Sequence, residues 1–423
     1  MDPVLSTLAI VSILALALTI HIGAGVGLAV LAAIFVGDLP VALFTQKLYS
    51  TFENFPLLAL PFFICAGDIM QRGTMAPALL KLSKTLVGHI TGGLSQVAVL
   101  GCGFYGSLCG SPPATVAAIG GILIPAMKKE GYPASFSAAV NTAAGSLGAL
   151  IPPSTLLIMY GGTAGVSIGD LFIAILGPGL LTMFVFMALA WIISLRRGYG
   201  IKSPKAGWKE RLAAVWEAKW ALMVPFIVLG GIYSGVTTPT EAGVVAVVYA
   251  LFAETFLTRT MTWRKFLDIL TSTVRTTGMI FYVVTSATAM GVLLVYFNVD
   301  QVVVELISGI SSSPAVITFM VATLIIIMGT FMEPGPIVLI MTPILLPLMV
   351  SIGCSPLQFG IIMGYGTTLG NITPPVGMNL YVGCSISDVS FAALSRAIMP
   401  FMFAQIAVFY VVTFCPAISF FLL

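Results

Sequence analysis

Two pairs of adjacent prolines, Pro152-Pro153 and Pro374-Pro375, interrupt long apolar stretches of the sequence. Proline has no N–H to donate, and the glycines that precede each pair permit unusual backbone angles, so carbonyl groups are left free there. Free carbonyls at a helix end carry partial negative charge and suit a dehydrated sodium ion, whereas exposed amides at a helix start suit a carboxylate. Each break could therefore hold both a cation and an anionic ligand.

Landmarks of the same residue type recur at a fixed distance along the chain. Four residues recur 222 positions later: Pro112, Pro125, Gly131 and Pro152 match Pro334, Pro347, Gly353 and Pro374. Each half thus predicts a hairpin with a Gly/Pro-rich tip, followed by a discontinuous helix. A single break would more simply be a kink, but paired interruptions in corresponding positions of two halves indicate a transporter's binding site.

The composition limits which elements can position these breaks. Hydrophobic residues make up 59% of the 423 residues and charged residues only 8%, against about 25% in soluble domains. Stretches such as Val4–Ile20 and Leu171–Leu195 are long enough to cross a hydrocarbon core about 30 Å thick. No basic residue precedes the first stretch, so we expect a retained helix rather than a cleaved signal peptide. The sequence predicts an all-α integral membrane protein.

The distribution of basic residues predicts the domain organisation and the orientation. Lys and Arg are frequent at 196–219, which we interpret as a cytoplasmic connector between two repeats, 1–195 and 220–423. Alternating outward from this connector places both termini in the periplasm and makes the two repeats inverted in topology. The expected elements are re-entrant hairpins at about 92–128 and 314–350, and broken helices at about 135–165 and 357–384.

A few polar side chains within the apolar segments are candidates for ligand binding. Glu333 is the one carboxylate at a hairpin tip, where it could bind a cation or cap the helix that begins at Pro334. Asn141 and Asn371 could donate to a substrate or could join helices to each other. We interpret Asp68 as a structural partner near the cytoplasmic end of its helix.

Five stretches of the sequence resemble one known family. They are FENFPLLALPFFICAGDIM (Phe52–Met70), GSPPATVAAIGGILIP (Gly110–Pro125), GALIPPSTLLIMY (Gly148–Tyr160), TTPTEAG (Thr237–Gly243) and TPPVGMNLYVG (Thr373–Gly383). In this order they resemble the large membrane subunit of tripartite ATP-independent periplasmic (TRAP) transporters. The first tip departs from the family pattern, which more often has Ser-Gly-Ser where this chain has Cys109-Gly110-Ser111, so a hydroxyl ligand is not expected at Cys109.

The resemblance implies a sodium-coupled importer of organic acid anions, such as C4-dicarboxylates or sialic acid, in the bacterial inner membrane. It implies an elevator mechanism with scaffold and transport regions, a small four-helix membrane subunit and a periplasmic substrate-binding protein as partners, and sodium as coupling ion without other cofactors. The implied sodium-binding residues are Gly110, Ser111, Gly148, Ile151 and Pro153 in the first half and Gly329, Glu333, Gly370, Thr373 and Val376 in the second.

No Lys or Arg lies at the centre of the expected site, so a substrate carboxylate would be held by tip amides and by small polar side chains. The expected substrate-binding residues are Ser111, Thr115, Asn141, Ser154, Asn371 and Pro375. The six cysteines have no metal-binding spacing, which argues against a transition-metal site. The net charge of +3 comes from short loops between apolar stretches and does not indicate a nucleic-acid partner.

Three other functions remain as alternatives. A sodium/dicarboxylate carrier of similar architecture would work without a binding protein, and transport by the reconstituted membrane protein alone would favour it. A channel would need a continuous pore, and its flux would neither saturate nor depend on a sodium gradient. A membrane-embedded enzyme is disfavoured, because the sequence has no HExxH motif and no clustered His/Asp or Ser/Lys pattern.

Overall fold

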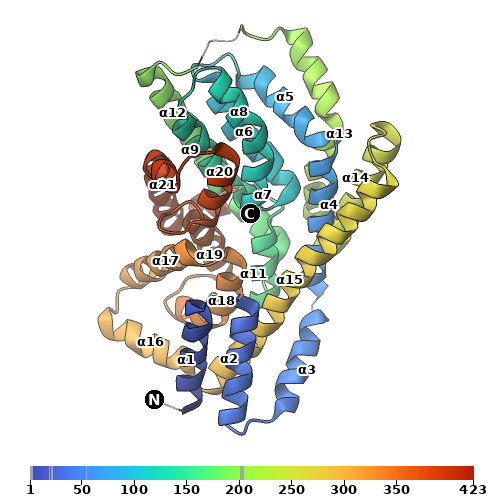
Figure 1. Ribbon diagram of the computed structural model, residues 1–423. Helices are drawn as coiled ribbons and strands as arrows, with labels where there is room; N and C mark the ends of the chain where they lie inside the picture. Colours follow the sequence, from blue (N-terminus) through green and yellow to red (C-terminus); the bar gives the residue numbers. More distant parts are fainter. Residues whose placement is uncertain (1–2, 19, 21, 54, 201–203) are drawn as a thin grey trace.

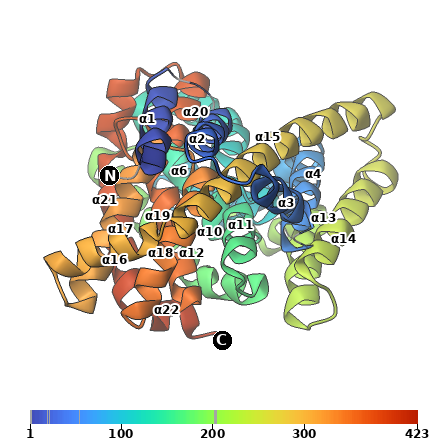
Figure 2. The same cartoon turned by 90° about the horizontal axis from the view of Figure 1, so that it is seen from below.

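The computed structural model describes residues 3–423 except 19, 21, 54 and 201–203, and the described residues form helices and no strand. Nine helical segments within this part of the chain are long and apolar enough to cross a bilayer. The predicted all-α membrane fold is thereby confirmed. Helices α13 and α14 lie along one side of the molecule and α16 on the opposite side (Figures 1 and 2).

The helices follow one another in four groups. The first comprises α1 (Pro3–Ala17), α2 (Ile22–Val36), α3 (Val41–Phe52), η1 (Phe55–Leu58), α4 (Ala59–Arg72) and α5 (Met75–Val87). The second comprises α6 (Gly93–Cys109), α7 (Pro112–Thr115), η2 (Val116–Gly120), α8 (Gly121–Lys129), α9 (Ala134–Ala144), α10 (Leu147–Leu150), α11 (Thr155–Ala164) and α12 (Ile168–Arg197). The third comprises α13 (Trp208–Tyr233), α14 (Pro239–Phe252), η3 (Ala253–Leu257), α15 (Trp263–Tyr296) and α16 (Val299–Ile310). The last comprises α17 (Pro314–Phe331), α18 (Pro334–Ser351), α19 (Pro356–Gly370), α20 (Met378–Ser387), α21 (Phe391–Phe414) and α22 (Ala417–Phe420).

Helix bounds repeat at the distance that the prolines predict. Helix α6 ends at Cys109 and α17 at Phe331, and the second arms of the two hairpins end at Lys129 and Ser351, so both pairs lie 222 positions apart. The Pro-Pro bonds of both breaks are cis. Figure 1 shows the first hairpin in the upper half of the molecule, with its tip helix α7 near the middle, and the second hairpin below it. The inversion of the two halves across a membrane stays a prediction.

Three segments differ from the sequence-based expectation. The apolar pattern does not predict α3, because polar residues such as Thr45 and Gln46 interrupt it. Within the predicted connector 196–219, the described residues 198–200 and 204–207 are non-helical, and residues 201–203 lie outside the described part of the chain. Helix α13 begins early because the Gly207 N–H donates to the Glu210 carboxylate at 3.0 Å, which caps its first turn. Helix α15 begins at Trp263 rather than near 276, so it too extends beyond its apolar part.

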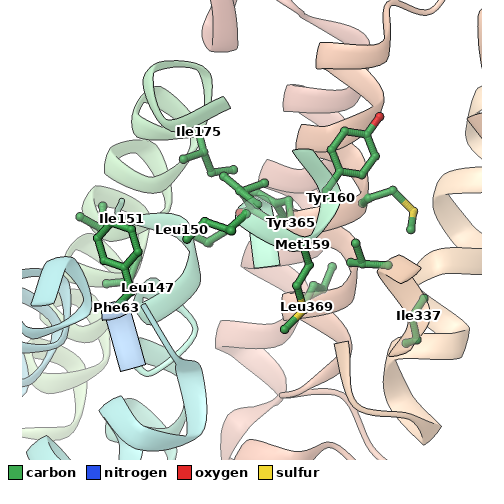
Figure 3. Packing of buried hydrophobic residues seen from close by; sticks show 14 of the residues in the cluster. Phe63, Leu147, Leu150, Ile151, Met159, Tyr160, Ile175, Ile337, Tyr365 and Leu369 are labelled. Atoms are coloured by element: carbon green, nitrogen blue, oxygen red, sulfur yellow. The ribbon is translucent and has the colours of Figure 1, made fainter. Parts of the chain in front are cut away.

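The two breaks are connected through the core. Helix α10, which leads into the first break, packs against α19, which leads into the second. Figure 3 shows Leu147 and Leu150 of α10 and Tyr365 of α19 in the same buried cluster. The Tyr160 hydroxyl of α11 donates to the Pro356 carbonyl at the start of α19, at 2.6 Å. The two breaks are therefore joined by direct packing and by this hydrogen bond.

A buried carboxylate fixes the junction between α4 and α5. Glu254 of η3 is fully buried and accepts hydrogen bonds from the Thr74 N–H at 2.8 Å, from the Thr258 hydroxyl at 2.7 Å and from the Thr260 hydroxyl. Gly73 leaves the room for it, because a Cβ at this position would overlap the carboxylate. The start of α5, which leads to the first hairpin, is thus attached to α14–η3.

We expect Glu254→Ala to lower the free energy of unfolding by about 2 kcal/mol, because it leaves the Thr74 N–H and the part-buried Thr258 and Thr260 hydroxyls without their acceptor. Thermal unfolding of the purified protein in detergent measures this loss. The matched control is Glu217→Ala, which removes an exposed ion pair with Lys81 (2.6 Å) and should cost less than about 1 kcal/mol. Equal effects of the two substitutions would contradict the role of Glu254 as an anchor.

Candidate functional site

A cavity of about 390 Å³ lies where the two hairpin tips meet helices α4 and α15. One wall consists of residues of α4 and α15: Ile64, Gly67, Asp68, Gln71, Thr276, Met279, Ile280 and Val283. The other wall consists of the two tips, the start of α11 and the second break: Cys109, Ser111, Pro112, Pro113, Ala114, Thr155, Leu156, Met159, Glu333, Pro334, Gly335, Pro336, Leu339, Asn371 and Met378. The volume suits a small organic molecule.

The first tip is in direct contact with the first break. A Cβ at Gly148 would lie 2.7 Å from the Ser111 carbonyl oxygen and would overlap the Thr115 hydroxyl, so the two backbones touch at this glycine. Gly110 has φ +61°, and a Cβ there would lie 2.7 Å from the Pro153 carbonyl oxygen. The Thr155 hydroxyl donates to the Gly110 carbonyl at 3.0 Å. Backbone oxygens of the tip and of the break are thereby concentrated in one small volume.

The second tip meets the second break in the same way. A Cβ at Gly370 would lie 2.6 Å from the Gly329 carbonyl oxygen, so α17 and α19 cross with their backbones in contact. Gly377 has φ +54°, and its N–H donates to the Thr330 carbonyl at 3.0 Å. The Thr373 hydroxyl donates to the Leu369 carbonyl at 2.9 Å, within its own turn. At both tip–break junctions, glycines allow the backbone of the tip to touch the backbone beside the break.

The residues predicted to bind sodium thus divide between these two junctions. Gly110, Gly148 and Pro153 lie at the first, while Gly329 and Gly370 lie at the second. The remaining members of the two predicted sets occupy the tips and the residues after the breaks: Ser111 and Glu333 line the cavity, Ile151 is buried, and Thr373 and Val376 are half-buried. These sodium ligands stay predictions.

Of the residues predicted to bind substrate, two line the cavity and four do not. Ser111 and Asn371 are on its wall. Asn371 is only 1% exposed, and neither atom of its side-chain amide has a hydrogen-bond partner. An unpaired buried amide is costly, so Asn371 is the residue of this set with the clearest unmet demand for a ligand.

The other four predicted substrate residues lie outside the cavity wall. The Thr115 hydroxyl is buried at the first junction, where it donates to the Ser111 carbonyl at 2.9 Å. Asn141 is buried and donates to the Ser137 carbonyl of its own helix at 2.8 Å. Ser154 is buried next to the cis prolines, and Pro375 is exposed away from the cavity. Their predicted contact with substrate has no geometric support.

The structure adds Asp68, which the sequence did not assign to the site. Asp68, interpreted from sequence as a structural partner, lines the cavity from α4, with the Thr273 hydroxyl of α15 at 3.4 Å as a long contact. Glu333, already assigned to the second sodium site, lines the cavity at the N-cap position of α18, and its side chain makes no capping hydrogen bond to that helix. The signal in the sequence was a carboxylate that follows a long apolar run in α4, since an intramembrane carboxylate is a functional candidate by default.

Comparisons with known proteins place the chain among membrane transport proteins. The sequence pattern of the family described as "Tripartite ATP-independent periplasmic transporter, DctM component" matches residues 7–418. The chain is 40% identical to the isethionate TRAP transporter permease protein DctMQ of Oleidesulfovibrio alaskensis over 95% of its own length, but it spans only 64% of that relative. It is 36% identical to the C4-dicarboxylate TRAP transporter large permease protein DctM of Rhodobacter capsulatus, over 96% of both chains.

One solved structure has a similar fold at low sequence identity. The YdaH transporter of Alcanivorax borkumensis superposes with a TM-score of 0.62 and 15% identity over 88% of each chain. At this identity the likeness concerns the fold alone, and it agrees with the helical membrane architecture described above.

Proposed function

The chain belongs to the DctM component family of tripartite ATP-independent periplasmic transporters, and on this premise we propose that it imports a small organic acid anion together with sodium. Membership makes it a multi-pass membrane protein and a permease of the secondary transporter class. The sodium coupling, the inward direction, the elevator mechanism and the substrate are our proposal. The binding-protein-independent carrier and the channel are the alternatives.

The observation that carries this proposal is the cavity at which both hairpin tips converge. The Ser111 hydroxyl and the buried side-chain amide of Asn371 offer donors for an acidic group. Related permeases are named for isethionate, which is a sulfonate, and for C4-dicarboxylates. We therefore propose a carboxylate or sulfonate anion as the substrate.

The proposed sodium sites are the two tip–break junctions. Backbone carbonyls concentrate at Gly110, Ser111 and Pro153 in the first half and at Gly329 in the second. Oxygen atoms at helix ends are suitable ligands for a dehydrated sodium ion. Since each tip also contributes to the cavity wall, binding of sodium would order the tip that the substrate contacts, which gives a physical route for coupling.

The proposed transport movement follows from the arrangement of the cavity. Helices α4 and α15 form one wall, and the tips and breaks form the other. In an elevator, the second wall would carry the substrate past the first. This requires the tips and breaks to move as one body, and the packing of α10 against α19 supports such a connection.

The proposed partners are a small four-helix membrane subunit and a periplasmic substrate-binding protein. The name DctMQ of the longer relative, of which the chain spans 64%, supports a second membrane component beside this chain. Both partners are proposals for this protein, as are its location in a bacterial inner membrane and the periplasmic position of its termini.

Uptake into proteoliposomes that contain the chain and its small subunit tests the function. With the binding protein outside, we expect saturable uptake that requires an inward sodium gradient. Two sodium ions carried with a monoanion move one net positive charge inward, so an inside-negative potential of 100 mV should add about 2.3 kcal/mol of driving force. A valinomycin-set potassium potential measures this term.

Three results would decide against the proposal or for its alternatives. Uptake that neither saturates nor responds to sodium would indicate a channel. Equal uptake without the binding protein would indicate a binding-protein-independent carrier. Uptake that saturates but depends neither on sodium nor on the membrane potential would contradict the proposed sodium coupling.

A further inference from the structure

The charges around the cavity are the opposite of what a simple anion needs. Among the described residues that line it there are two carboxylates, Asp68 and Glu333, and no Lys, Arg or His. Among the described side chains, one ion pair forms, between Lys81 and Glu217, and it lies on the surface away from the cavity. The cavity therefore presents negative charge on the wall formed by α4, and an anionic substrate must be oriented with respect to it.

Asp68 has little protein contact that would explain its presence there. The Thr273 hydroxyl approaches its carboxylate at 3.4 Å, which is at the long end for a hydrogen bond. The side chain is half-buried, and Gly67 beside it packs on Cys109 of the first tip, where a Cβ would lie 3.2 Å from the Cys109 Cα. Asp68 is thus held close to the tip while its carboxylate retains capacity to accept hydrogen bonds.

A second polar group on the cavity wall lacks a partner independently of Asp68. Both amide atoms of Asn371 are unpaired although the residue is 1% exposed, and this residue belongs to the second break, on the wall formed by the tips and breaks. A ligand that forms hydrogen bonds with both walls must place an acidic group, or another acceptor, next to the tips and Asn371. It must bring a hydrogen-bond donor to Asp68, because a second acidic group placed there would be repelled.

We propose that Asp68 accepts a hydrogen bond from a hydroxyl or ammonium group of the substrate, so that the cavity selects hydroxy acids or amino acids over unsubstituted acids and dianions. This inference rests on the proposed function, since it assumes that an organic acid occupies the cavity. It assigns the acidic group of the substrate to the tip side and the donor group to α4. A site that hydrogen-bonds a substrate hydroxyl discriminates strongly against the analogue that lacks it.

Matched ligands test this selection directly. The sulfonates are ethanesulfonate, isethionate and taurine; the three-carbon acids are propionate, 3-hydroxypropionate and β-alanine; and the six-carbon acids are hexanoate and gluconate, with succinate as the dianion. Cys109 lines the cavity and reports its occupancy, because a bound ligand should slow alkylation of its thiol. Peptide mass spectrometry resolves this cysteine from the exposed Cys415, which serves as the internal control.

The measurement uses the chain with its small subunit in proteoliposomes, in sodium and in potassium buffer. In at least one series, we expect the hydroxy or amino member to protect Cys109 at concentrations at least about tenfold lower than the unsubstituted member. Asp68→Asn should reduce this preference below about threefold, and Asp68→Glu should retain part of it. Asp268→Asn, at an exposed position of α15, is the matched control and should change nothing.

Each remaining result has a definite meaning. If unsubstituted acids or succinate protect as well as the hydroxy and amino acids, the inference is overturned while the proposed function stands. The same holds if Asp68→Asn keeps the preference for hydroxy and amino acids. It also holds if Asp68→Asn changes only the sodium dependence of protection, because Asp68 would then bind a cation. If no acid protects Cys109 or shifts the unfolding temperature of the protein in either buffer, the proposed function fails and the inference fails with it. The comparison on the unsubstituted chain decides the question even where a variant does not fold.

Discussion

Replacing Gly370 with alanine should reduce sodium-dependent uptake by at least about tenfold, because the added methyl group separates the second tip from the second break. The new Cβ would lie 2.6 Å from the Gly329 carbonyl oxygen, and the atoms it meets are backbone rather than a flexible side chain. Overpacking of this kind costs about 1–3 kcal/mol even where side chains can adjust. Here α17 or α19 must move, which displaces the carbonyls proposed to bind sodium.

The dependence of uptake on sodium concentration measures the effect. We expect the half-saturating sodium concentration to rise more than the maximal rate of uptake falls. Gly148→Ala is the corresponding change in the first half, where the Cβ would lie 2.7 Å from the Ser111 carbonyl oxygen. Its effect should be smaller, since its shortest contact with backbone, 2.7 Å, is longer than the 2.2 Å contact of the Cβ at Gly370 with the Gly329 carbonyl carbon. Gly121→Ala, which meets nothing within 4 Å, is the control for both. Unchanged sodium activation in Gly370→Ala and Gly148→Ala would contradict the two proposed sites.

The repeat was predictable from the sequence because proline and glycine fix backbone geometry locally. Helix ends at Cys109 and Phe331 follow directly from the tips, and no long-range packing is needed to place them. The same reasoning found the glycines that the structure brings together, since Gly148 and Gly370 precede the breaks. The prolines and glycines in the sequence therefore identify both tip–break junctions.

The assignment of individual side chains was less predictable, because it depends on which way each helix is turned. Asn141 and Asn371 are both amides within apolar stretches, yet the Asn141 amide nitrogen donates to the Ser137 carbonyl, whereas both amide atoms of Asn371 are unpaired and Asn371 lines the cavity. Asp68 belongs to α4, outside the repeated hairpin and break, and only the packing of α4 beside the first tip brings it to the cavity. Polar caps such as Glu210 extended helices beyond their apolar parts, which a hydropathy pattern does not register.

Replacing Asn371 with leucine should weaken substrate binding while leaving the empty protein as stable as before or more stable. Both amide atoms are buried without a partner, so the empty protein already bears the desolvation cost of this side chain. An apolar side chain of similar size removes that cost. In the substrate complex, by contrast, the substitution removes a hydrogen bond to a charged group, worth about 1.5–3 kcal/mol or roughly 10- to 150-fold in affinity.

Asn379 provides the matched control for this prediction. Its amide is also fully buried and unpaired, but the residue does not line the cavity. Asn379→Leu should therefore share the effect on thermal unfolding without the loss of affinity. Unfolding temperatures in detergent, with and without substrate, measure both quantities on the same sample. If Asn371→Leu and Asn379→Leu lower the unfolding temperature equally and bind substrate equally well, Asn371 is a helix-packing residue. A selective loss of the substrate-induced shift in Asn371→Leu would instead make the unpaired amide a substrate contact.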